Sequence, residues 1–400
     1  MKAKGIEKIL VTGGAGFIGS HTADLLTEHD YHVTILDSLE PQVHGENEKL
    51  PEHVNSNTAF ICGDIRDREL LKKAMQEVDA VIHLAAMVGV GQSMYQTERY
   101  VDVNTKGTAT LLDVLVNEES DVKKLVVASS MSIYGEGKYY CEECSTNVFP
   151  TLRDERQLER RQWNHLCSTC NSPLTPQPTD EEKPLIPTSV YAMTKRHQEE
   201  MCLLVGMTYG IPTVALRYFN VYGSRQALSN PYTGCAAIFT SRILNNKPPY
   251  VFEDGNQTRD FIHVKDTARA NLSSLEHDNA NYKAINVGTG KPITIKNLAE
   301  ILIKLYGKSN LQPHVSNEPR RGDIRHCYAD IQRARNLLNF KPSISLEKGL
   351  TELADWAKTH GWETIDLFEK ALKELRERHL ATYFSKPTST QDLRTLGESE

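Results

Sequence analysis

The chain has 400 residues, a formal net charge of −6 at pH 7, 39% hydrophobic residues and 24% charged residues. This length allows two or three ordinary domains with a large buried core. The mild negative charge argues against nucleic acid as a partner, and there is no run of about 18 apolar residues that would place the chain in a membrane. A predicted strand begins so early that we expect no signal peptide, and we expect the eight cysteines to be reduced thiols in the cytoplasm.

The stretch 8–37 has the strand, glycine turn, helix and strand of a dinucleotide-binding unit. Its first run, 8–12, is apolar and β-branched. Gly13 permits a tight turn, Gly16 lets a pyrophosphate approach the backbone, and Gly19 lets helix and strand pack closely. The pyrophosphate would then lie on the free N–H groups at the start of the helix.

Asp37 closes this unit, 18 residues after Gly19. Its carboxylate could accept two hydrogen bonds from a ribose diol and would repel a 2′-phosphate. Ser38 follows it, and no Arg or Lys occurs before Lys49. The sequence therefore favours NAD over NADP as the cofactor.

Strands and helices alternate through much of the chain. Further strands are predicted at 58–62, 80–86, 124–128 and 212–217, and helical stretches end near 78, 117 and 209. This alternation predicts an α/β fold with a doubly wound parallel sheet of the Rossmann type. Ligands of such sheets bind at the carboxyl ends of the strands.

The same patterns divide the chain into parts. Residues 1–135 and 188–225 form the predicted cofactor-binding domain, and the polar segment 136–187 is interpreted as an insertion. Residues 226–380 are predicted to form a smaller substrate lobe with some return to the sheet, and with helices near 234–246, 265–277, 294–306, 330–337 and 345–359. The Ser/Thr-rich residues 381–400 are predicted to be a disordered tail.

Tyr191 and Lys195 lie four positions apart, and therefore on one face of a predicted helix. Alone, this pair also fits a solvated helix flank. Here it follows a nucleotide-binding pattern and a serine-rich strand end, 129–132. A lysine and a positive nicotinamide would lower the pKa of the phenol toward neutrality. Such a tyrosine can remove a hydroxyl proton while hydride leaves the same carbon.

Short motifs are spread over most of the chain, interrupted only by the insertion. They are Gly13-x2-Gly16-x2-Gly19, Asp64-Ile65, His83-Leu84-Ala85-Ala86, Ser129-Ser130-x-Ser132-Ile133-Tyr134-Gly135, Tyr191-x3-Lys195, Arg217-Tyr218-Phe219-Asn220-Val221-Tyr222-Gly223, Gly255-x2-Thr258-Arg259-Asp260-Phe261-Ile262-His263-Val264 and Arg320-x-Gly322-Asp323. This combination resembles the extended short-chain dehydrogenase/reductases. Within them it resembles the nucleotide-sugar epimerases and dehydratases.

By position, the resemblance implies that Ser130, Tyr191 and Lys195 are catalytic. It implies a dinucleotide site made of Gly13, Gly16, Phe17, Ile18, Gly19, Asp37, Asp64, Ile65, Leu84, Ala85, Ala86, Asn104, Ser129, Tyr191, Lys195 and Tyr218. It assigns nucleotide-sugar contacts to Ser132, Asn220, Arg259, Arg320 and Asp323, with the arginines on the diphosphate. The resemblance also implies a homodimer that packs the helices near 95–117 and 188–209 into a four-helix bundle.

The two residues that directly follow the catalytic serine differ between members of this family that catalyse different reactions. The 4,6-dehydratases carry an Asp-Glu pair there, and the decarboxylases and GDP-mannose dehydratases carry a Glu. In this chain the positions are Met131 and Ser132, which cannot act as acid or base near pH 7. The resemblance then implies simple oxidation and re-reduction, as in 4-epimerases of the galactose-epimerase type.

In such an epimerase, Tyr191 would take the proton of the 4-hydroxyl while hydride passes to NAD. The 4-keto sugar would turn about its diphosphate, and hydride would return to the other face. By resemblance, the run 227–234 and the insertion favour dTDP-L-rhamnose and dTDP-6-deoxy-L-talose as the substrate pair. UDP-glucose and UDP-galactose are the alternative pair.

The insertion carries Cys141-x2-Cys144 and, 22 residues later, Cys167-x2-Cys170. This spacing is close to that of a four-thiolate zinc ribbon, with a slightly long central segment. A closed four-cysteine site leaves no position for substrate, so the zinc would be structural and would staple a segment without a core of its own. Two CxxC disulfides or four ordinary buried cysteines are the alternatives.

Other polar residues have plainer interpretations. His83 and His263 are expected to pack rather than to catalyse, and His165 is expected to be exposed rather than to be a further zinc ligand. The mixed-charge run 153–161 is interpreted as a solvated helix, with a protein-partner surface as the alternative.

Two other functions stay open at this point. A 4-ketoreductase would consume NADPH, which Asp37 disfavours. An NAD-sensing or zinc-ribbon scaffold protein would not need the Tyr191 and Lys195 pair that this chain retains.

Overall fold

A seven-stranded parallel sheet forms the centre of the protein. The computed structural model describes residues 3, 5–46, 49–360 and 364–381. The strand order is β13-β9-β5-β4-β1-β2-β3, which confirms the predicted doubly wound sheet. β13 comes from the segment assigned to the substrate lobe. The strands are β1 (Lys8–Thr12), β2 (His32–Asp37), β3 (Ala59–Cys62), β4 (Ala80–His83), β5 (Lys124–Ser130), β9 (Thr213–Tyr218) and β13 (Lys283–Val287).

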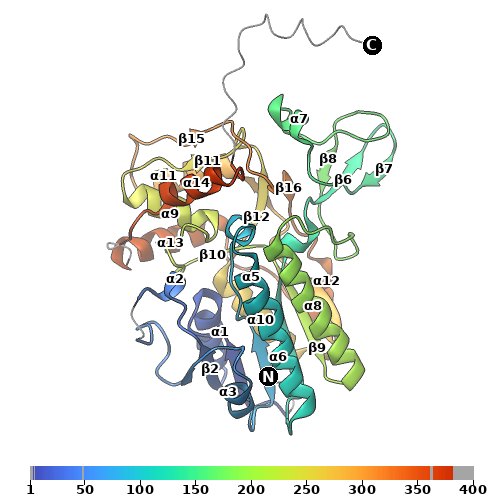
Figure 1. Cartoon of the computed structure of the whole chain (residues 1–400), viewed down its shortest axis with the longest axis vertical. Coiled ribbons are helices and arrows are strands. Elements are labelled where there is room, and N and C mark those ends of the chain that lie inside the picture. Colours follow the sequence, from blue (N-terminus) through green and yellow to red (C-terminus); the bar gives the residue numbers. More distant parts are fainter. Residues whose placement is uncertain (1–2, 4, 47–48, 361–363, 382–400) are drawn as a thin grey trace, which may run out of the picture.

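Helices cover both faces of this sheet (Figure 1). One face carries α1 (Phe17–Glu28), α10 (Val264–Glu276) and α12 (Gln332–Leu338), and the other carries α3 (Arg68–Ala74), α6 (Gly107–Asn117) and α8 (Val190–Tyr209). Successive side chains of a strand point to opposite faces. In β1, Ile9 and Val11 join the core beneath α1, whereas Leu10 joins the core beneath α6. Burial on both faces explains why the strands are continuous apolar runs.

The helix predicted at 95–117 is continuous but is not α-helical throughout. α5 (Thr97–Tyr100) passes into a π-helical turn, Val101–Lys106, and then into α6. Buried Asn104 lies in this turn. Its amide donates to the Met87 carbonyl (3.1 Å) and to Thr194 Oγ1 (2.9 Å), and its Oδ1 accepts from the Met87 N–H (2.7 Å). The widened turn therefore fastens the loop after β4 to α8.

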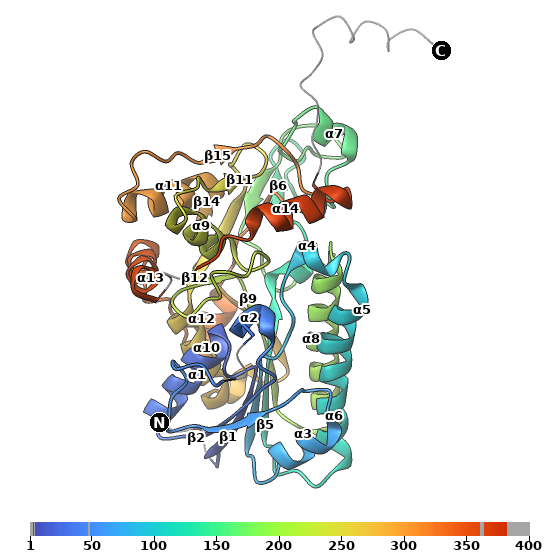
Figure 2. The same cartoon turned by 60° about the vertical axis from the view of Figure 1, so that its left-hand side comes forward.

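A smaller lobe lies above the carboxyl edge of the sheet (Figure 2). Its main sheet has the order β10-β12-β14, and β16 also pairs with β12. These strands are β10 (Asn220–Tyr222), β12 (Thr258–His263), β14 (Pro292–Thr294) and β16 (His326–Cys327), and a separate parallel pair is β11 (Tyr250–Val251) with β15 (His314–Val315). The predicted helices are present as α9 (Cys235–Leu244), α11 (Ile295–Leu305) and α13 (Leu346–His360).

Some elements were not predicted. The largest is α14 (Phe368–Glu377), and the shorter ones are α2 (Pro41–His44), α4 (Val90–Ser93) and the 3-10 turns Met131–Tyr134 and Asp278–Ala280. The fourth strand ends at His83, so the predicted extension to residue 86 is wrong. Ala381 forms a bridge with Arg320, and the rest of the predicted tail lies outside the described residues. None of the described helices has the length and apolar composition that crossing a bilayer requires.

The insertion folds as a small unit beside the lobe (Figure 1). It contains an antiparallel sheet of the order β7-β6-β8, with β6 (Lys138–Cys141), β7 (Thr146–Val148) and β8 (Thr175–Gln177), and one short helix, α7 (Glu155–Glu159). The solvated-helix interpretation is wrong for Arg153, which is buried and contacts Glu253 of the lobe at 2.7 Å. The exposed interpretation of His165 is also wrong, because His165 is buried 2.9 Å from a Glu136 oxygen. Arg153 is buried by its contact with the lobe and His165 by a contact inside the insertion, and the sequence pattern reveals neither.

Candidate active site

A cavity of about 590 Å³ lies between the carboxyl edge of the sheet and the lobe. Residues at the ends of β1, β4, β5 and β9 form one wall, and residues of β12, the loop 320–324 and α14 form the opposite wall. Doubly wound sheets bind ligands at this edge. The volume is within the range of ligand pockets, roughly 300–1,000 Å³.

The glycine turn at one end of the cavity has no space for side chains. Gly13 has a φ of +69°, and a Cβ there would lie 2.8 Å from the Ala85 nitrogen. A Cβ on Gly19 would lie 2.1 Å from the Gly13 carbonyl oxygen. Gly16 is the N-cap of α1 and makes no side-chain cap. The first N–H groups of α1 are thus presented to the cavity, which suits a pyrophosphate.

Asp37 lies next to this turn, and its carboxylate is fixed by backbone. Its Oδ2 accepts from the Ala15 N–H (3.1 Å) and its Oδ1 from the Leu39 N–H (2.9 Å). His44 lies 3.7 Å away, and burial lowers the pKa of its imidazole. A buried carboxylate beside a neutral ring suits a ribose diol and disfavours a 2′-phosphate.

The adenine-side pair predicted at 64–65 also lines the cavity. Asp64 binds Arg66 at 2.6 Å, and this hydrogen bond holds the pKa of the Asp64 carboxyl below its usual value. Arg66 also pairs with Asp102. Two carboxylates therefore neutralise this arginine, which leaves little attraction for an additional phosphate at this end.

Ser130, Tyr191 and Lys195 all line the cavity, from the end of β5 and from α8. Ser130 Oγ accepts from the N–H (3.1 Å) and from the hydroxyl (2.9 Å) of Ser132. Ser189 caps the N-terminus of α8, which sets the direction of the tyrosine-bearing turn. Proton-transfer groups thus converge on one side of the cavity.

The protein without NAD does not test the expected lowering of the Tyr191 pKa. Burial raises the pKa of this phenol, and the hydrogen bond with Ser130 only opposes that effect. Burial also lowers the pKa of Lys195 to about 7. The Lys195 ammonium donates to Gln198 Oε1 (2.7 Å). The charge of a nicotinamide, which the expectation included, acts only in the NAD complex.

A buried polar layer supports the lysine. Gln198 Nε2 contacts His83 Nε2 (3.2 Å) and donates to Thr108 Oγ1 (2.7 Å), and His83 Nδ1 contacts Thr12 Oγ1 (2.8 Å). Burial lowers the pKa of His83 to about 3, so the ring is neutral. His83 is packed behind the cavity wall, as expected, and is a positioning residue for Gln198.

Four residues that line the cavity, Gln226 and Gln257 among them, have a buried side-chain polar atom without a hydrogen-bond partner among the described residues. Ser129 Oγ and Asn220 Oδ1 have no hydrogen-bond partner within the part of the chain that the structure describes. Buried polar groups are nearly always paired in native proteins. These two atoms are therefore available to a polar ligand.

Two arginines lie at the far end of the cavity. Arg259 donates to the carbonyls of Ile324 (2.7 Å) and Arg325 (3.1 Å). Arg320 donates to both carboxylate oxygens of Asp323 (2.9 and 2.7 Å), and its guanidinium lies 5.1 Å from the centre of the Phe252 ring. Two fixed guanidinium groups on one wall suit a diphosphate.

The structure brings almost all sequence-predicted residues to this cavity. Of the predicted catalytic, cofactor-binding and substrate-binding residues, Asn104 is the exception, because it lies behind the wall and fastens the loop after β4 to α8. Sequence reasoning missed an apolar wall made of Phe252, Phe368, Leu372 and Leu375. The sequence did contain a signal for this wall, because Phe368, Leu372 and Leu375 have the spacing of an apolar helix face.

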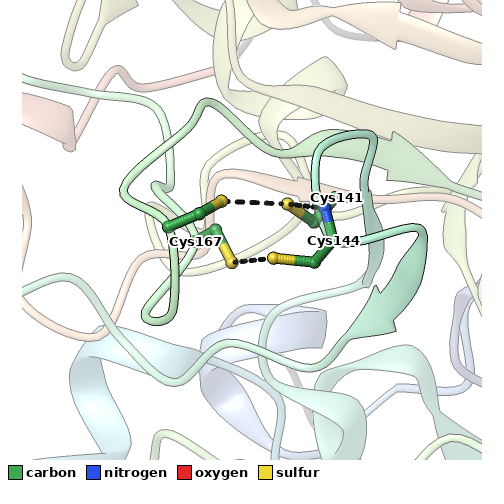
Figure 3. A group of neighbouring side chains, drawn as sticks. Cys141, Cys144 and Cys167 are labelled. Atoms are coloured by element: carbon green, nitrogen blue, oxygen red, sulfur yellow. Dashed lines mark hydrogen bonds between the residues drawn. The ribbon is translucent and has the colours of Figure 1, made fainter.

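The four cysteines of the insertion come together away from this cavity (Figure 3). The sulfurs of Cys141 and Cys170 are 3.4 Å apart and those of Cys144 and Cys167 are 3.9 Å apart, and all four lie within 4.8 Å of one another. None of them is in a disulfide. Backbone N–H groups lower the pKa of Cys167 to about 6, whereas neighbouring sulfurs raise the pKa of Cys144 to about 12. The prediction that these cysteines form one cluster is confirmed.

Comparisons with known proteins agree with the site. Residues 9–154 and 153–288 match the NAD dependent epimerase/dehydratase family. The chain belongs to this family. It is 35% identical over 354 residues to a dTDP-L-rhamnose 4-epimerase of Burkholderia thailandensis, an alignment that covers 88% of this chain and 94% of the relative.

Solved structures of family members have the same fold. UDP-glucose 4-epimerase of Thermotoga maritima, crystallised with UDP-glucose, has a TM-score of 0.71 and 30% identity, and the match covers 88% of this chain and 99% of that chain. UDP-glucuronic acid 4-epimerase of Bacillus cereus, in complex with UDP-glucuronic acid and NAD, has a TM-score of 0.68 and 31% identity with the same coverage. Our chain is thus an NAD-dependent nucleotide-sugar 4-epimerase, an isomerase. The glycine turn, the fixed Asp37 carboxylate and the unpaired Ser129 hydroxyl fit NAD.

Proposed function

We propose that this epimerase interconverts dTDP-L-rhamnose and dTDP-6-deoxy-L-talose. The proposal rests on the 35% identity to the dTDP-L-rhamnose 4-epimerase over nearly the whole chain. A relative named "Putative UDP-glucose 4-epimerase" has the same identity, so the UDP sugars are the alternative. The wall beside Tyr191 supports it, because the loop after β4 contributes the uncharged residues Met87, Val88 and Gly89. A 6-deoxy sugar presents a methyl group where glucuronate presents a carboxylate, and a methyl group needs no cation there.

Tyr191 is proposed to remove the proton of the 4-hydroxyl and to return one after inversion. Ser130 holds the reacting oxygen, and Lys195 binds the nicotinamide ribose and stabilises the phenolate when it is charged. NAD, when bound, accepts hydride from C4 and gives it back on the opposite face. Met131 and Ser132 supply no second acid or base, so neither elimination nor decarboxylation is expected.

The substrate end is proposed to hold the nucleotide while the hexose turns. Arg259 and Arg320 would bind the diphosphate, with Asp323 orienting Arg320, and Asn220 and Ser132 would contact the sugar. In this proposal, residues 1–135 and 188–225 form the cofactor-binding domain, which also contributes Ser132 and Asn220 to the sugar, and residues 226–380 contribute the diphosphate-binding arginines.

The test is incubation of the purified protein with dTDP-L-rhamnose, UDP-glucose and UDP-galactose in separate reactions without added cofactor. We expect the 4-epimer of dTDP-L-rhamnose as the product, detected by nuclear magnetic resonance. Turnover of the UDP sugars without turnover of dTDP-L-rhamnose would overturn the substrate assignment. A requirement for stoichiometric NADPH would indicate the ketoreductase instead.

We propose that the cysteine cluster binds one structural zinc ion. Tetrahedral zinc with Zn–S bonds of about 2.3 Å separates its sulfurs by about 3.8 Å, which is close to the observed 3.4 and 3.9 Å. Disulfides, at about 2.05 Å, do not fit these distances. Four thiolates this close together repel one another, and a divalent cation offsets the repulsion.

Metal analysis tests the zinc proposal. Protein purified without added metal should contain about one zinc per chain, and Cys144→Ser should lose it, whereas Cys62→Ser, outside the cluster, should keep it. Metal-free protein with four titratable thiols, or with a mass showing two disulfides, would contradict the proposal.

We also propose a homodimer that uses α8. This helix exposes Leu204 (62%), Met207 (56%) and Tyr209 (60%), which is an unusual apolar content for a solvent face. Light scattering should show a dimer at micromolar concentration, and Leu204→Glu should shift it toward monomer. A wild-type monomer under these conditions would refute the proposal.

A further inference from the structure

The insertion makes buried ionic contacts with the lobe that carries the two cavity arginines. Glu253, two residues after β11, is 2% exposed and binds Arg153 of the insertion (2.7 Å) and Arg325 of the lobe (2.9 Å). Arg325 is 1% exposed and also binds Asp254 (2.6 Å) and Asn164 Oδ1 of the insertion (3.0 Å). Such charges are costly to bury and are stable only when paired, so these ion pairs hold the two units together.

Arg153 reaches further than this ion pair. Its guanidinium also donates to the Asp323 carbonyl (3.1 Å) and to the Trp163 carbonyl (2.9 Å). Asp323 is the residue that holds Arg320 through both carboxylate oxygens. One buried guanidinium therefore joins the insertion to the residue that orients a cavity arginine.

A second connection begins at Glu136, the first residue of the insertion. Its buried carboxylate accepts from the backbone N–H groups of Arg325 (2.7 Å) and His326 (3.3 Å), and from the Tyr139 hydroxyl (3.0 Å). Tyr139 packs in the same small core as the cluster cysteines. The backbone that Glu136 fixes includes the Arg325 carbonyl, which accepts from Arg259.

We propose that the four-cysteine insertion is a positioning element of the substrate site, and that Arg153 is its principal positioning residue. It fixes the segment 320–325 so that Arg259 and Arg320 face the diphosphate. The inference rests on the proposed role of these two arginines. Without the contacts from the insertion, the segment 320–325 would become ordered only when substrate binds. The conformational entropy lost on ordering would weaken substrate binding.

This arrangement predicts a split between kinetic constants. Tyr191 and Ser130 lie on α8 and β5 of the cofactor-binding domain, outside the segment that Arg153 fixes. Loss of Arg153 should therefore raise KM and leave kcat nearly unchanged. A merely structural role would lower the amount of folded protein without this split.

The experiment compares Arg153→Ala with Glu155→Ala in the full-length, metal-loaded protein. Glu155 also reaches from the insertion to this segment, but its pair with Arg321 is at the surface, where the side chains are 64% and 54% exposed. Exposed pairs contribute little. We expect Arg153→Ala to raise KM, and the Kd for dTDP, about tenfold, and Glu155→Ala to change neither. Arg153→Lys should recover part of the affinity, because it can pair with Glu253 but cannot reach all three acceptors.

Two further variants separate a failure of the insertion's positioning role from a failure of the proposed substrate site. Asn164→Ala removes one uncharged contact to Arg325, and it replaces Arg153→Ala if that variant does not fold. Arg259→Ala serves as the reference for diphosphate binding. If Arg259→Ala binds dTDP as well as wild type, the proposed substrate site is wrong. If Arg259→Ala weakens dTDP binding while Arg153→Ala and Asn164→Ala do not, or if they lower kcat alone, the positioning role of the insertion is wrong.

Discussion

The two ends of the cavity are built in different ways. At the dinucleotide end, Gly13, Gly19 and Asp37 belong to one continuous strand–helix–strand unit. The atoms closest to the two glycines are backbone atoms, and so are the hydrogen-bond donors to the Asp37 carboxylate. At the proposed diphosphate end, Arg320 lies in the segment 320–325, and Arg259 donates hydrogen bonds to it. Arg153, 170 residues away in the chain, donates a hydrogen bond to Asp323 of the same segment. The glycine turn and Asp37 are therefore held by residues close in the sequence, apart from the approach of Ala85 to Gly13, whereas the surroundings of the two arginines include contacts from the insertion.

The largest expected effect removes the chemistry and leaves both ends intact. Tyr191→Phe should lower kcat roughly a thousandfold, because general acid–base catalysis contributes about 10²–10⁴. NAD content and the Kd for dTDP should stay near wild type. The matched control is Tyr100→Phe, a buried neighbour whose ring lies 6.4 Å from that of Tyr191. An active Tyr191→Phe would favour the NAD-sensing or scaffold function.

The next variant breaks the dinucleotide end alone. In Gly19→Ala the new Cβ meets backbone, which cannot move aside as a side chain can. We expect the purified protein to lose its NAD and the free energy of unfolding to fall by about 1–3 kcal/mol. Isothermal titration calorimetry should still show dTDP binding. Equal losses of NAD and dTDP affinity would mean that the two ends are not independent.

A smaller effect is expected where α14 closes the diphosphate end. Leu372 is buried in the cavity wall, so Leu372→Ala should raise KM by about threefold to tenfold through a looser wall. NAD affinity should not change. Lys373→Ala, on the exposed side of the same helix, is the control. A change in NAD affinity without a change in KM would contradict the placement of α14 at the substrate end.

The last prediction concerns acid stability at the dinucleotide end. Burial lowers the pKa of His83 from 6.5 to about 3, so the unfolded chain binds an extra proton between these values. Stability is therefore lost as pH falls below about 6.5, by about 2 kcal/mol at pH 5. His83→Gln cannot titrate and should lose less stability between pH 7 and pH 5 in urea unfolding. An unchanged pH dependence would show that His83 is not the titrating group.

The sequence features that indicate the dinucleotide end are local, so they can be recognised without knowledge of the fold. The glycines, the closing acid and the alternating strands need only neighbouring residues to be recognised, and even Tyr191 with Lys195 depends on one helix. The two cavity arginines, Arg259 and Arg320, were predicted only through the family resemblance, because no spacing rule joins residues from β12 and from a loop near 320.

The rest could not be read from the sequence for physical reasons. Arg153 lies in a run of alternating charges that is typical of a solvated helix, and its burial depends on a partner carboxylate far along the chain. The lowering of the Tyr191 pKa stays a prediction for the NAD complex, because in the protein on its own burial raises that pKa. α14 was missed although its apolar residues have helical spacing, because the alternation of the fold had already weakened there.

Transfer of a labelled hydrogen tests the central claim most directly. Substrate carrying deuterium at C4 is incubated with the purified epimerase in ordinary water without added cofactor, and the product is examined by nuclear magnetic resonance and mass spectrometry. The account predicts an inverted C4 that retains its deuterium, because the same hydrogen leaves and returns within one active site. Loss of the deuterium to solvent, or product formation only with added NADPH, would contradict it.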